Sequence, residues 1–470
     1  MKQLIRNLLI ISLVFILIFA FIFLGVIHQE EKSRNLLKSK SAESKYALKE
    51  IYQKAGNIYD RNRQILAESS QGERNYAADP YVAAALVQVI GDYTQNIANT
   101  VEERYRAELI GSNRGGFAQF ISDLKGHGLK GLDLRLSLDS RLVRKAAELL
   151  ENYTASLLLL NYQTGEILAL ANTPLVSPEQ VIEYRDIKEG SLFNKAFLAS
   201  YAPGSTFKVV TDLAWISSRE FKPDYHVDCL GANPLLGPGS VLENRVDAGH
   251  GRVGRAEALA QSCNHYFGRV GVTVGARQII DTAENFAFNK EYNLDKITVG
   301  KPVLDLNQQI DDFVLSWYSI GQAIEGQKLE LSPLHLALIS AAVANDGEMM
   351  QPKLLLDLSQ GGEVEESYTR PQILSHVAEA AQMQILQKDM IYSVEHGLAR
   401  SAQIPGEEVG GKTGTAQFNT ATGELKHNAL YTGFLKNPRC PLAVGIVIEG
   451  ENPDISAIAA ELMKTALDIK

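Results

Sequence analysis

The chain has 470 residues, of which 45% are hydrophobic, and it carries a net charge of −9. This length is enough for about two or three domains with sizeable cores, and the negative charge excludes a basic surface of the kind that binds nucleic acid. The three cysteines form no C-x-x-C pair, and the nine histidines show no metal-ligand spacing. The sequence therefore implies no metal and no other cofactor.

The first element is an apolar stretch from Leu8 to Ile27, in which Ser12 is the only polar residue and no residue is charged. Such a stretch is long enough to cross a bilayer, so the sequence predicts a cytoplasmic tail at 1–7 and a single transmembrane helix at 8–27. A signal peptide would have a shorter apolar core and a better cleavage site. Lysine and arginine are more numerous after the stretch than before it, which by itself favours the opposite orientation.

Residues 28–133 are expected to form a stalk and a small α+β domain. A charged, helix-prone segment covers 29–54, and two short strand-like pieces surround a turn within 56–67. From 76 to 131 the apolar residues follow a helical period, interrupted by glycine-rich joints. Nothing in this part of the chain indicates chemistry.

A larger α+β domain is expected from 134 to 470, with a central antiparallel sheet and helices on both sides of it. Alternating or continuous apolar runs predict strands at 134–138, 156–161, 165–170 and 442–449. The strands at 156–161 and 165–170 read as a hairpin. Helical periods predict a helix that starts after Asp139, a long apolar helix at 333–345 and a C-terminal helix at 455–467.

Ser205 and Lys208 lie at the start of a predicted buried helix, within the stretch Tyr-Ala-Pro-Gly-Ser-Thr-Phe-Lys at 201–208. Residues three apart share one helix face, so the lysine amine can reach the serine hydroxyl and, if burial lowers its pKa, can take its proton. A lone Ser-x-x-Lys is more often a helix cap beside a solvated lysine. Two further motifs change that balance: Ser262-Cys263-Asn264 and Lys412-Thr413-Gly414-Thr415.

The order Ser-x-x-Lys, Ser-x-Asn, Lys-Thr-Gly resembles that of penicillin-binding proteins and serine β-lactamases. Further segments at 56–67, 164–169, 319–322 and 332–334 extend the resemblance over nearly the whole chain. The chain is similar to class B penicillin-binding proteins with a short pedestal domain. It departs from them at Ala55, where an arginine is usual, and at Arg63, where a turn glycine is usual.

The resemblance implies that Ser205 attacks the carbonyl between two terminal D-alanines of a peptidoglycan stem peptide and forms an acyl-enzyme. Lys208 would act as base, and Ser262, linked to Lys208 and Lys412, would pass a proton to the leaving amine. The backbone N–H groups of Ser205 and Thr415 would form the oxyanion hole. An amine of a second stem peptide would then take the acyl group.

The same resemblance implies how the substrate is held. Asn264 would hold its amide side chain, and the hydroxyls of Thr413 and Thr415, with the charge of Lys412, would bind its terminal carboxylate. Gly414 would let the substrate backbone approach the strand closely.

Location and partners also follow from the resemblance. Peptidoglycan lies outside the cytoplasmic membrane, so the predicted orientation is a single-pass protein of the cell membrane with an extracytoplasmic catalytic domain. Stem peptides and β-lactams would be its ligands, and a membrane glycosyltransferase would be its partner.

Several alternatives remain open. A β-lactamase or a DD-carboxypeptidase would use the same acylation, and 291–295 (Glu-Tyr-Asn-Leu-Asp) nearly matches a lactamase motif; a β-lactam sensor and a non-enzymatic scaffold are weaker. The segment 406–413 also fits the phosphate loop G-x-x-x-x-G-K-[ST], but neither a preceding buried strand nor a following helix is predicted there.

Overall fold

The computed structural model describes residues 45–112, 131–230, 249–324, 327–419 and 425–469, with scattered positions between 3 and 25. The predicted membrane span at 8–27 falls partly outside these residues, while its described positions 12–17 are helical. Among the described residues, no helix is both long and apolar enough to cross a bilayer. The membrane helix therefore stays a prediction.

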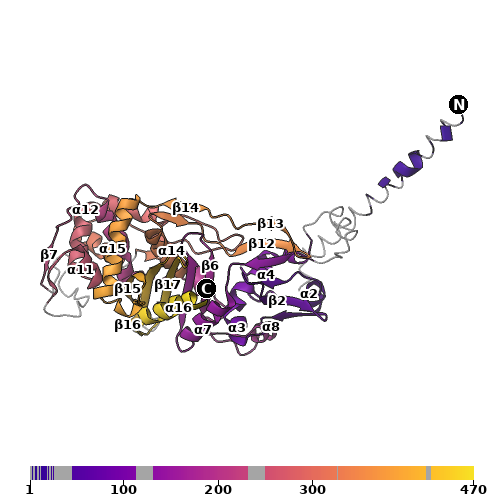
Figure 1. Cartoon of the computed structure of the whole chain (residues 1–470), viewed down its shortest axis with the longest axis horizontal. Coiled ribbons are helices and arrows are strands. Elements are labelled where there is room, and N and C mark those ends of the chain that lie inside the picture. The colour runs from indigo at the N-terminus through magenta and orange to yellow at the C-terminus, as the bar shows by residue number, and fades with distance from the viewer. Residues whose placement is uncertain are drawn as a thin grey trace.

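A five-stranded antiparallel sheet forms the centre of the larger part of the molecule (Figure 1). Its strands lie in the order β15 (Glu408–Asn419), β16 (Leu425–Lys436), β17 (Leu442–Ile448), β5 (Ala155–Asn161) and β6 (Ile167–Asn172). All neighbours pair antiparallel. The predicted hairpin is thus confirmed as β5 and β6, and the predicted strand at 442–449 as β17.

Helices cover both faces of this sheet, which explains why the inner strands β5 and β17 are almost entirely apolar. The helix α14 (Pro333–Ala344) is buried along its whole length and packs against β5, β16 and β17. It approaches closely because Gly445 of β17 has no side chain: a Cβ there would lie 2.2 Å from the carbonyl oxygen of Pro333. On the other side, α16 (Ile455–Ile469) and α7 (Ser140–Leu150) contact strands of the sheet. The expected α+β class with helices on both sides is confirmed.

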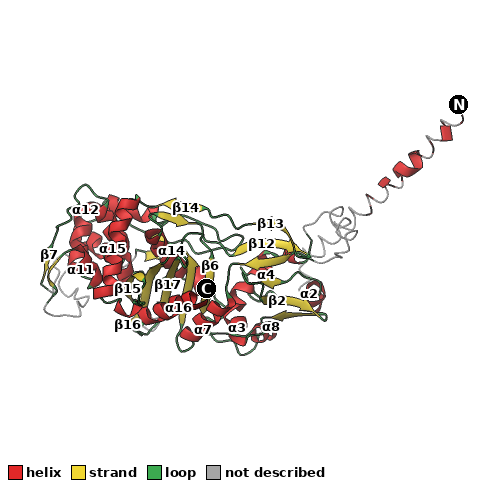
Figure 2. Ribbon diagram, viewed as in Figure 1, coloured by secondary structure: helices red, strands yellow, loops and turns green. Residues whose placement is uncertain are grey.

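A second, six-stranded sheet lies beside the first, at the opposite end from the helices α11, α12 and α15 (Figure 2). Its order is β13 (Glu363–Ser367), β12 (Leu355–Gln360), β4 (Asp133–Leu136), β1 (Ile58–Tyr59), β2 (Ile65–Ser70) and β3 (Glu73–Tyr76). The strand predicted at 134–138 is β4, and it pairs with β1 and β12. This sheet therefore takes strands from both sides of the predicted domain boundary at residue 134.

The turn between β1 and β2 contains no glycine, and hydrogen bonds from the backbone to a side chain stabilise it. Arg63 adopts a φ of +62°, the left-handed region that glycine occupies most easily. The carboxylate of Asp60 accepts hydrogen bonds from the backbone N–H groups of Asn62 and Gln64, both at 2.8 Å. These bonds hold the turn although a non-glycine residue stands in it.

The remaining described helices and strands complete the chain. They are, in order, α2 (Lys45–Tyr52), α3 (Pro80–Ile90), α4 (Val101–Arg104), α5 (Arg106–Leu109), α8 (Pro178–Glu183), α9 (Lys195–Leu198), a 3-10 turn at Gly204–Phe207, α10 (Lys208–Ile216), β7 (Val227–Cys229), β8 (Gly251–Val253), α11 (Arg255–Ala260), α12 (Asn264–Asn285), β9 (Val303–Leu304), α13 (Asp312–Ser319), β10 (Leu329–Glu330), β11 (Glu348–Met350), β14 (Ile373–His376), α15 (Ala380–His396) and a 3-10 turn at Arg400–Ala402.

Candidate active site

Ser205 lies on a 3-10 turn that runs directly into α10, so it stands at a helix start as the sequence predicts. The backbone N–H of Gly204 donates to the carbonyl of Gly321 at 3.1 Å, which fixes the turn from the side. Both glycines have positive φ, +51° and +86°. A Cβ on Gly321 would lie only 1.8 Å from the carbonyl oxygen of Gly204, so the two backbones meet with no room for a side chain.

The amine of Lys208 links two of the three motifs. Its Nζ lies 3.0 Å from Ser205 Oγ and 3.1 Å from Ser262 Oγ, and it donates to Asn264 Oδ1 at 2.6 Å. The side chain is fully buried. Burial, together with the positive charge of Lys412, lowers the pKa of Lys208 well below its ordinary value. A neutral amine at this distance can accept the proton of the serine hydroxyl.

The second motif occupies the joint between α11 and α12. Ser262 has a φ of +56°, which turns the chain sharply between the two helices. Cys263 caps α12, and its Sγ accepts the backbone N–H of Tyr266 at 3.4 Å. Asn264 is then the first residue of α12. The sharp turn brings both the Ser262 hydroxyl and the Asn264 carboxamide onto the Lys208 amine.

Lys412 belongs to the middle of β15, where it stands opposite Thr432 of β16. Its side chain is fully buried, and its amine donates to the carbonyl of Thr413 at 2.8 Å. Burial lowers the pKa of Lys412 to about 7. Near neutral pH this amine therefore exists in both charge states.

The third motif packs against the Ser205 turn through backbone contacts. A Cβ on Gly204 would lie 2.5 Å from the carbonyl oxygen of Thr415, and one on Gly414 would lie 2.9 Å from Cγ2 of Thr206. Only residues without a side chain allow the strand and the turn to lie this close. The structure thus brings all three motifs to one place, although they are far apart in the sequence.

Solvent reaches only some of these groups. The two lysine side chains are fully buried, whereas the other predicted side chains are partly or fully exposed: Ser205, Ser262, Asn264, Thr413 and Thr415. The arrangement is a polar surface backed by two buried amines. Such a surface can present a hydroxyl nucleophile and several hydrogen-bond donors to a bound molecule while its base stays dry.

A buried group of charges joins the helices α10, α11 and α15. Arg255, the first residue of α11, forms an ion pair with Asp389 of α15 and lies 3.8 Å from Asp212 of α10. Burial and the nearby Asp389 raise the pKa of Asp212 well above its ordinary value. Sequence reasoning missed this group because its members are distant in the chain. The one local signal was the carboxyl group of Asp212 in a helix that is mostly apolar and fully buried.

The geometry disfavours two alternative interpretations of the sequence, the phosphate loop and the lactamase motif. Lys412 lies inside a twelve-residue strand, not in a loop that opens a helix, so the phosphate-loop interpretation is wrong. In the near match to a lactamase motif, Glu291 is exposed, and Asp295 Oδ2 accepts the backbone N–H groups of Leu354 and Leu355, both at 2.9 Å. Those bonds tie the segment to the start of β12.

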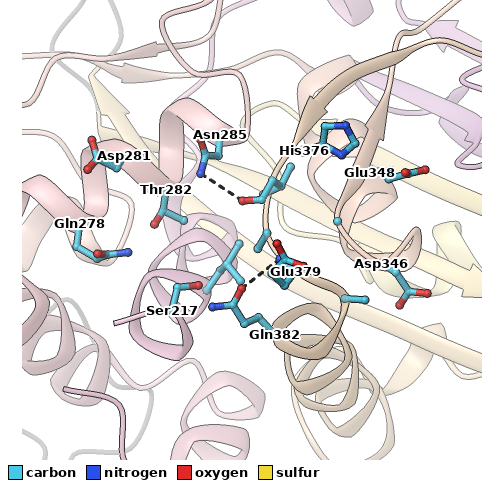
Figure 3. A pocket seen from close by; sticks show the side chains of 15 residues that line it. Ser217, Gln278, Asp281, Thr282, Asn285, Asp346, Glu348, His376, Glu379 and Gln382 are labelled. Carbon is cyan, nitrogen blue, oxygen red and sulfur yellow. Dashed lines mark hydrogen bonds between the residues drawn. The ribbon is translucent and has the colours of Figure 1, made fainter. Parts of the chain in front are cut away.

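A separate pocket of about 590 Å³ lies at the far end of α10 (Figure 3). It is lined by polar residues of α12, of the loops next to β11, and of the segment between β14 and α15. Asn285 donates there to the carbonyl of Val377 at 3.3 Å. None of the predicted site residues lines this pocket, so it is distinct from the Ser205 surface.

Comparison with known proteins gives the class of protein. The family described as "Penicillin binding protein transpeptidase domain" matches residues 155–468, which is more than half of the chain. The chain belongs to this family. The match includes Ser205, Lys208, Ser262, Asn264 and Lys412.

Individual relatives have modest sequence identity but extensive coverage. The peptidoglycan D,D-transpeptidase PbpA of Mycolicibacterium smegmatis is 26% identical over 400 residues, which are 80% of this chain and 80% of that protein. A crystal structure of the D,D-transpeptidase domain of a peptidoglycan glycosyltransferase from Eggerthella lenta is 25% identical, with a TM-score of 0.74 over 88% of this chain and 98% of that one. The imipenem acyl-enzyme complex of penicillin-binding protein A from M. tuberculosis is 23% identical, with a TM-score of 0.76 over 89% and 100%. The last likeness supports the fold alone.

Proposed function

We propose that the protein is a serine DD-transpeptidase that crosslinks peptidoglycan stem peptides through an acyl-enzyme on Ser205. The observation that carries this proposal is the position of the Lys208 amine, within 3.1 Å of both the Ser205 and the Ser262 hydroxyls. Membership of the transpeptidase family supports it. A serine without a neighbouring base would be a poor nucleophile.

In the acylation step, Ser205 Oγ attacks the carbonyl carbon of the penultimate D-alanine while its proton moves to Lys208. The carbon–nitrogen bond to the terminal D-alanine then breaks, and the departing amine receives a proton through Ser262. The backbone N–H groups of Ser205 and Thr415 would stabilise the negatively charged oxygen of the intermediate. Loss of one such donor typically lowers a rate by about 100- to 1,000-fold.

Substrate binding would use the exposed edge of β15. The hydroxyls of Thr413 and Thr415 and the positive charge of Lys412 would hold the terminal carboxylate, and Asn264 would hold an amide of the stem peptide. The absence of a side chain at Gly414 lets the strand lie against the Ser205 turn; a contact of Gly414 with the substrate backbone remains part of the proposal. A β-lactam carries a carboxylate and a reactive amide, so it would occupy the same groups.

The acceptor of the acyl group distinguishes a transpeptidase from a carboxypeptidase or a β-lactamase. A transpeptidase passes the acyl group to the amine of a second stem peptide, whereas a carboxypeptidase or a β-lactamase passes it to water. The backbone bonds at Asp295 support a structural use of the segment that nearly matches a lactamase motif.

The proposal also includes a membrane location for the protein. The apolar stretch at 8–27 would anchor the protein as a single membrane helix with its catalytic domain outside the cytoplasm, where peptidoglycan lies. A membrane glycosyltransferase would supply the glycan strands that this protein crosslinks, as the resemblance to class B penicillin-binding proteins implies.

Labelling with a fluorescent penicillin tests the function. The wild-type protein should form one covalent adduct that persists for many minutes, and Ser205→Ala should form none. Ser217→Ala is the control, because Ser217 lies at the other end of α10. Label on the Ser205 variant would remove this residue from its role, and rapid loss of label would identify a β-lactamase. Incubation with a stem-peptide donor and an amine acceptor should give the crosslinked product in excess over the hydrolysed one by mass spectrometry.

A further inference from the structure

Three soft ligand groups lie together beside the candidate active site. They are the thiol of Cys229, the imidazole of His250 and the thiol of Cys263, and their ligand atoms all lie within 4.8 Å of one another. No short ligand motif marks this group in the sequence, because 20 residues separate Cys229 from His250. The group is a product of tertiary structure.

Separate elements bring each member into place. Cys229 ends β7, and it pairs in register with Gly251, so the preceding residue, His250, lies beside it at the start of β8. Cys263 caps α12 between Ser262 and Asn264. Both cysteine side chains are fully buried, and His250 is half-buried. These three side chains therefore lie where the β7–β8 hairpin meets the joint of α11 and α12.

The distances suit a tetrahedral metal ion. With ordinary zinc–sulfur and zinc–nitrogen bonds, a sulfur and a nitrogen bound to one zinc ion lie about 3.6 Å apart, and two sulfurs lie about 3.8 Å apart. Cys229 Sγ is 3.4 Å from His250 Nδ1. The other two pairs of ligand atoms lie within 4.8 Å, so they would have to approach each other by about 1.2 Å at most. A disulfide would require the two sulfur atoms to approach to about 2.05 Å and would leave the imidazole unused.

The donor set also has the usual support around it. The Sγ of Cys263 already accepts the backbone N–H of Tyr266, and such bonds hold metal-bound thiolates in orientation. Two thiolates and one imidazole prefer zinc to magnesium or calcium, which take oxygen ligands. Three protein ligands leave one coordination position for water or another donor.

We propose that Cys229, His250 and Cys263 bind one Zn²⁺ ion, which ties the β7–β8 hairpin to the chain segment that carries Ser262 and Asn264. The ion has a positioning role: it fixes Cys263, and through the adjacent peptide bonds it fixes the two side chains that contact the Lys208 amine. Binding converts both thiols to thiolates and releases their protons to solvent. No oxidation or reduction is involved.

The first test uses the full-length protein in reduced form, freed of metal by a chelator and titrated with Zn²⁺ alone. One equivalent should bind tightly, and it should raise the melting temperature. Titration with Co²⁺ should give the strong near-ultraviolet band of a thiolate–cobalt bond. Failure of the wild-type protein to bind one equivalent of either ion overturns the proposal, and this measurement does not depend on any variant folding correctly.

Variants locate the site. Cys229→Ser, His250→Gln and Cys263→Ser should each weaken Zn²⁺ binding by about 100-fold or more. Cys440→Ser is the matched control, because Cys440 is also a buried cysteine and lies outside the cluster. Binding by the three variants as tight as that of wild type overturns the assignment. So does a Cys229–Cys263 disulfide in the freshly isolated protein, seen as a mass 2 Da below that of the reduced chain.

Discussion

The charge of Lys412 should set the alkaline limit of acylation. Its side chain is fully buried, and burial lowers the pKa of its amine to about 7. If the charged amine binds the carboxylate of a penicillin, the second-order rate of acylation follows the protonated fraction of Lys412 in the free enzyme. That fraction is about 90% at pH 6 and about 10% at pH 8. The rate should therefore fall about tenfold between these pH values.

The protonation state of the proposed base, Lys208, should limit the rate of acylation at the acidic side of the pH profile. Burial and the charge of Lys412 both lower the pKa of Lys208. The prediction requires that Lys208 lose its proton at a lower pH than Lys412. This gives a pH window in which the base is neutral and the carboxylate-binding amine is charged. Below that window the rate should rise with pH, as Lys208 becomes neutral.

Fluorescent penicillin labelling over short times, repeated from pH 5.5 to 9, measures the profile. Lys412→Arg keeps its charge over this range, and Lys412→Gln carries none, so both variants should lose the alkaline fall although both react more slowly. An unchanged midpoint in either variant, or a wild-type rate that increases from pH 6 to pH 8, would refute the assignment of this limb to Lys412.

Two further predictions concern stability and backbone packing. Burial lowers the pKa of His335 to about 3, whereas the pKa of histidine in the unfolded chain is about 6.5. Below pH 6.5 the unfolded state therefore binds a proton that the folded state does not bind. The free energy of unfolding should fall as the pH falls below 6.5, by about 2 kcal/mol at pH 5. In urea unfolding, His335→Gln should show a smaller loss between pH 7 and pH 5 than wild type, whereas the exposed His427→Gln should not. Gly321→Ala should slow acylation by about 100-fold, because its Cβ would displace the backbone of Gly204 beside Ser205. Gly190→Ala, which has a similar φ of +76° but open space around it, should label at the wild-type rate; equal rates for the two variants would contradict the packing argument.

The local sequence determined the elements and the candidate chemistry. The apolar runs at 156–161 and 442–449 form inner strands that are buried on both faces. The apolar run at 333–345 forms a helix that is buried around its whole circumference. Elements buried on all sides have continuous apolar sequences, so they can be predicted from the sequence. The spacing of Ser205 and Lys208 was equally decisive. Three residues within one helical turn place amine and hydroxyl side by side whatever the rest of the chain does, and the structure has them 3.0 Å apart.

Only the tertiary structure decided what is assembled from distant parts. In the six-stranded sheet, β4 lies between β1 and β12. The residues of a short strand do not specify which strand pairs with its edge, because that depends on which strand the fold places beside it. The Arg255 ion pair and the group of Cys229, His250 and Cys263 arise in the same way. The pKa values of the two lysines also belong to this level, because they depend on how completely the folded chain removes water from an amine, and that is a property of packing rather than of sequence.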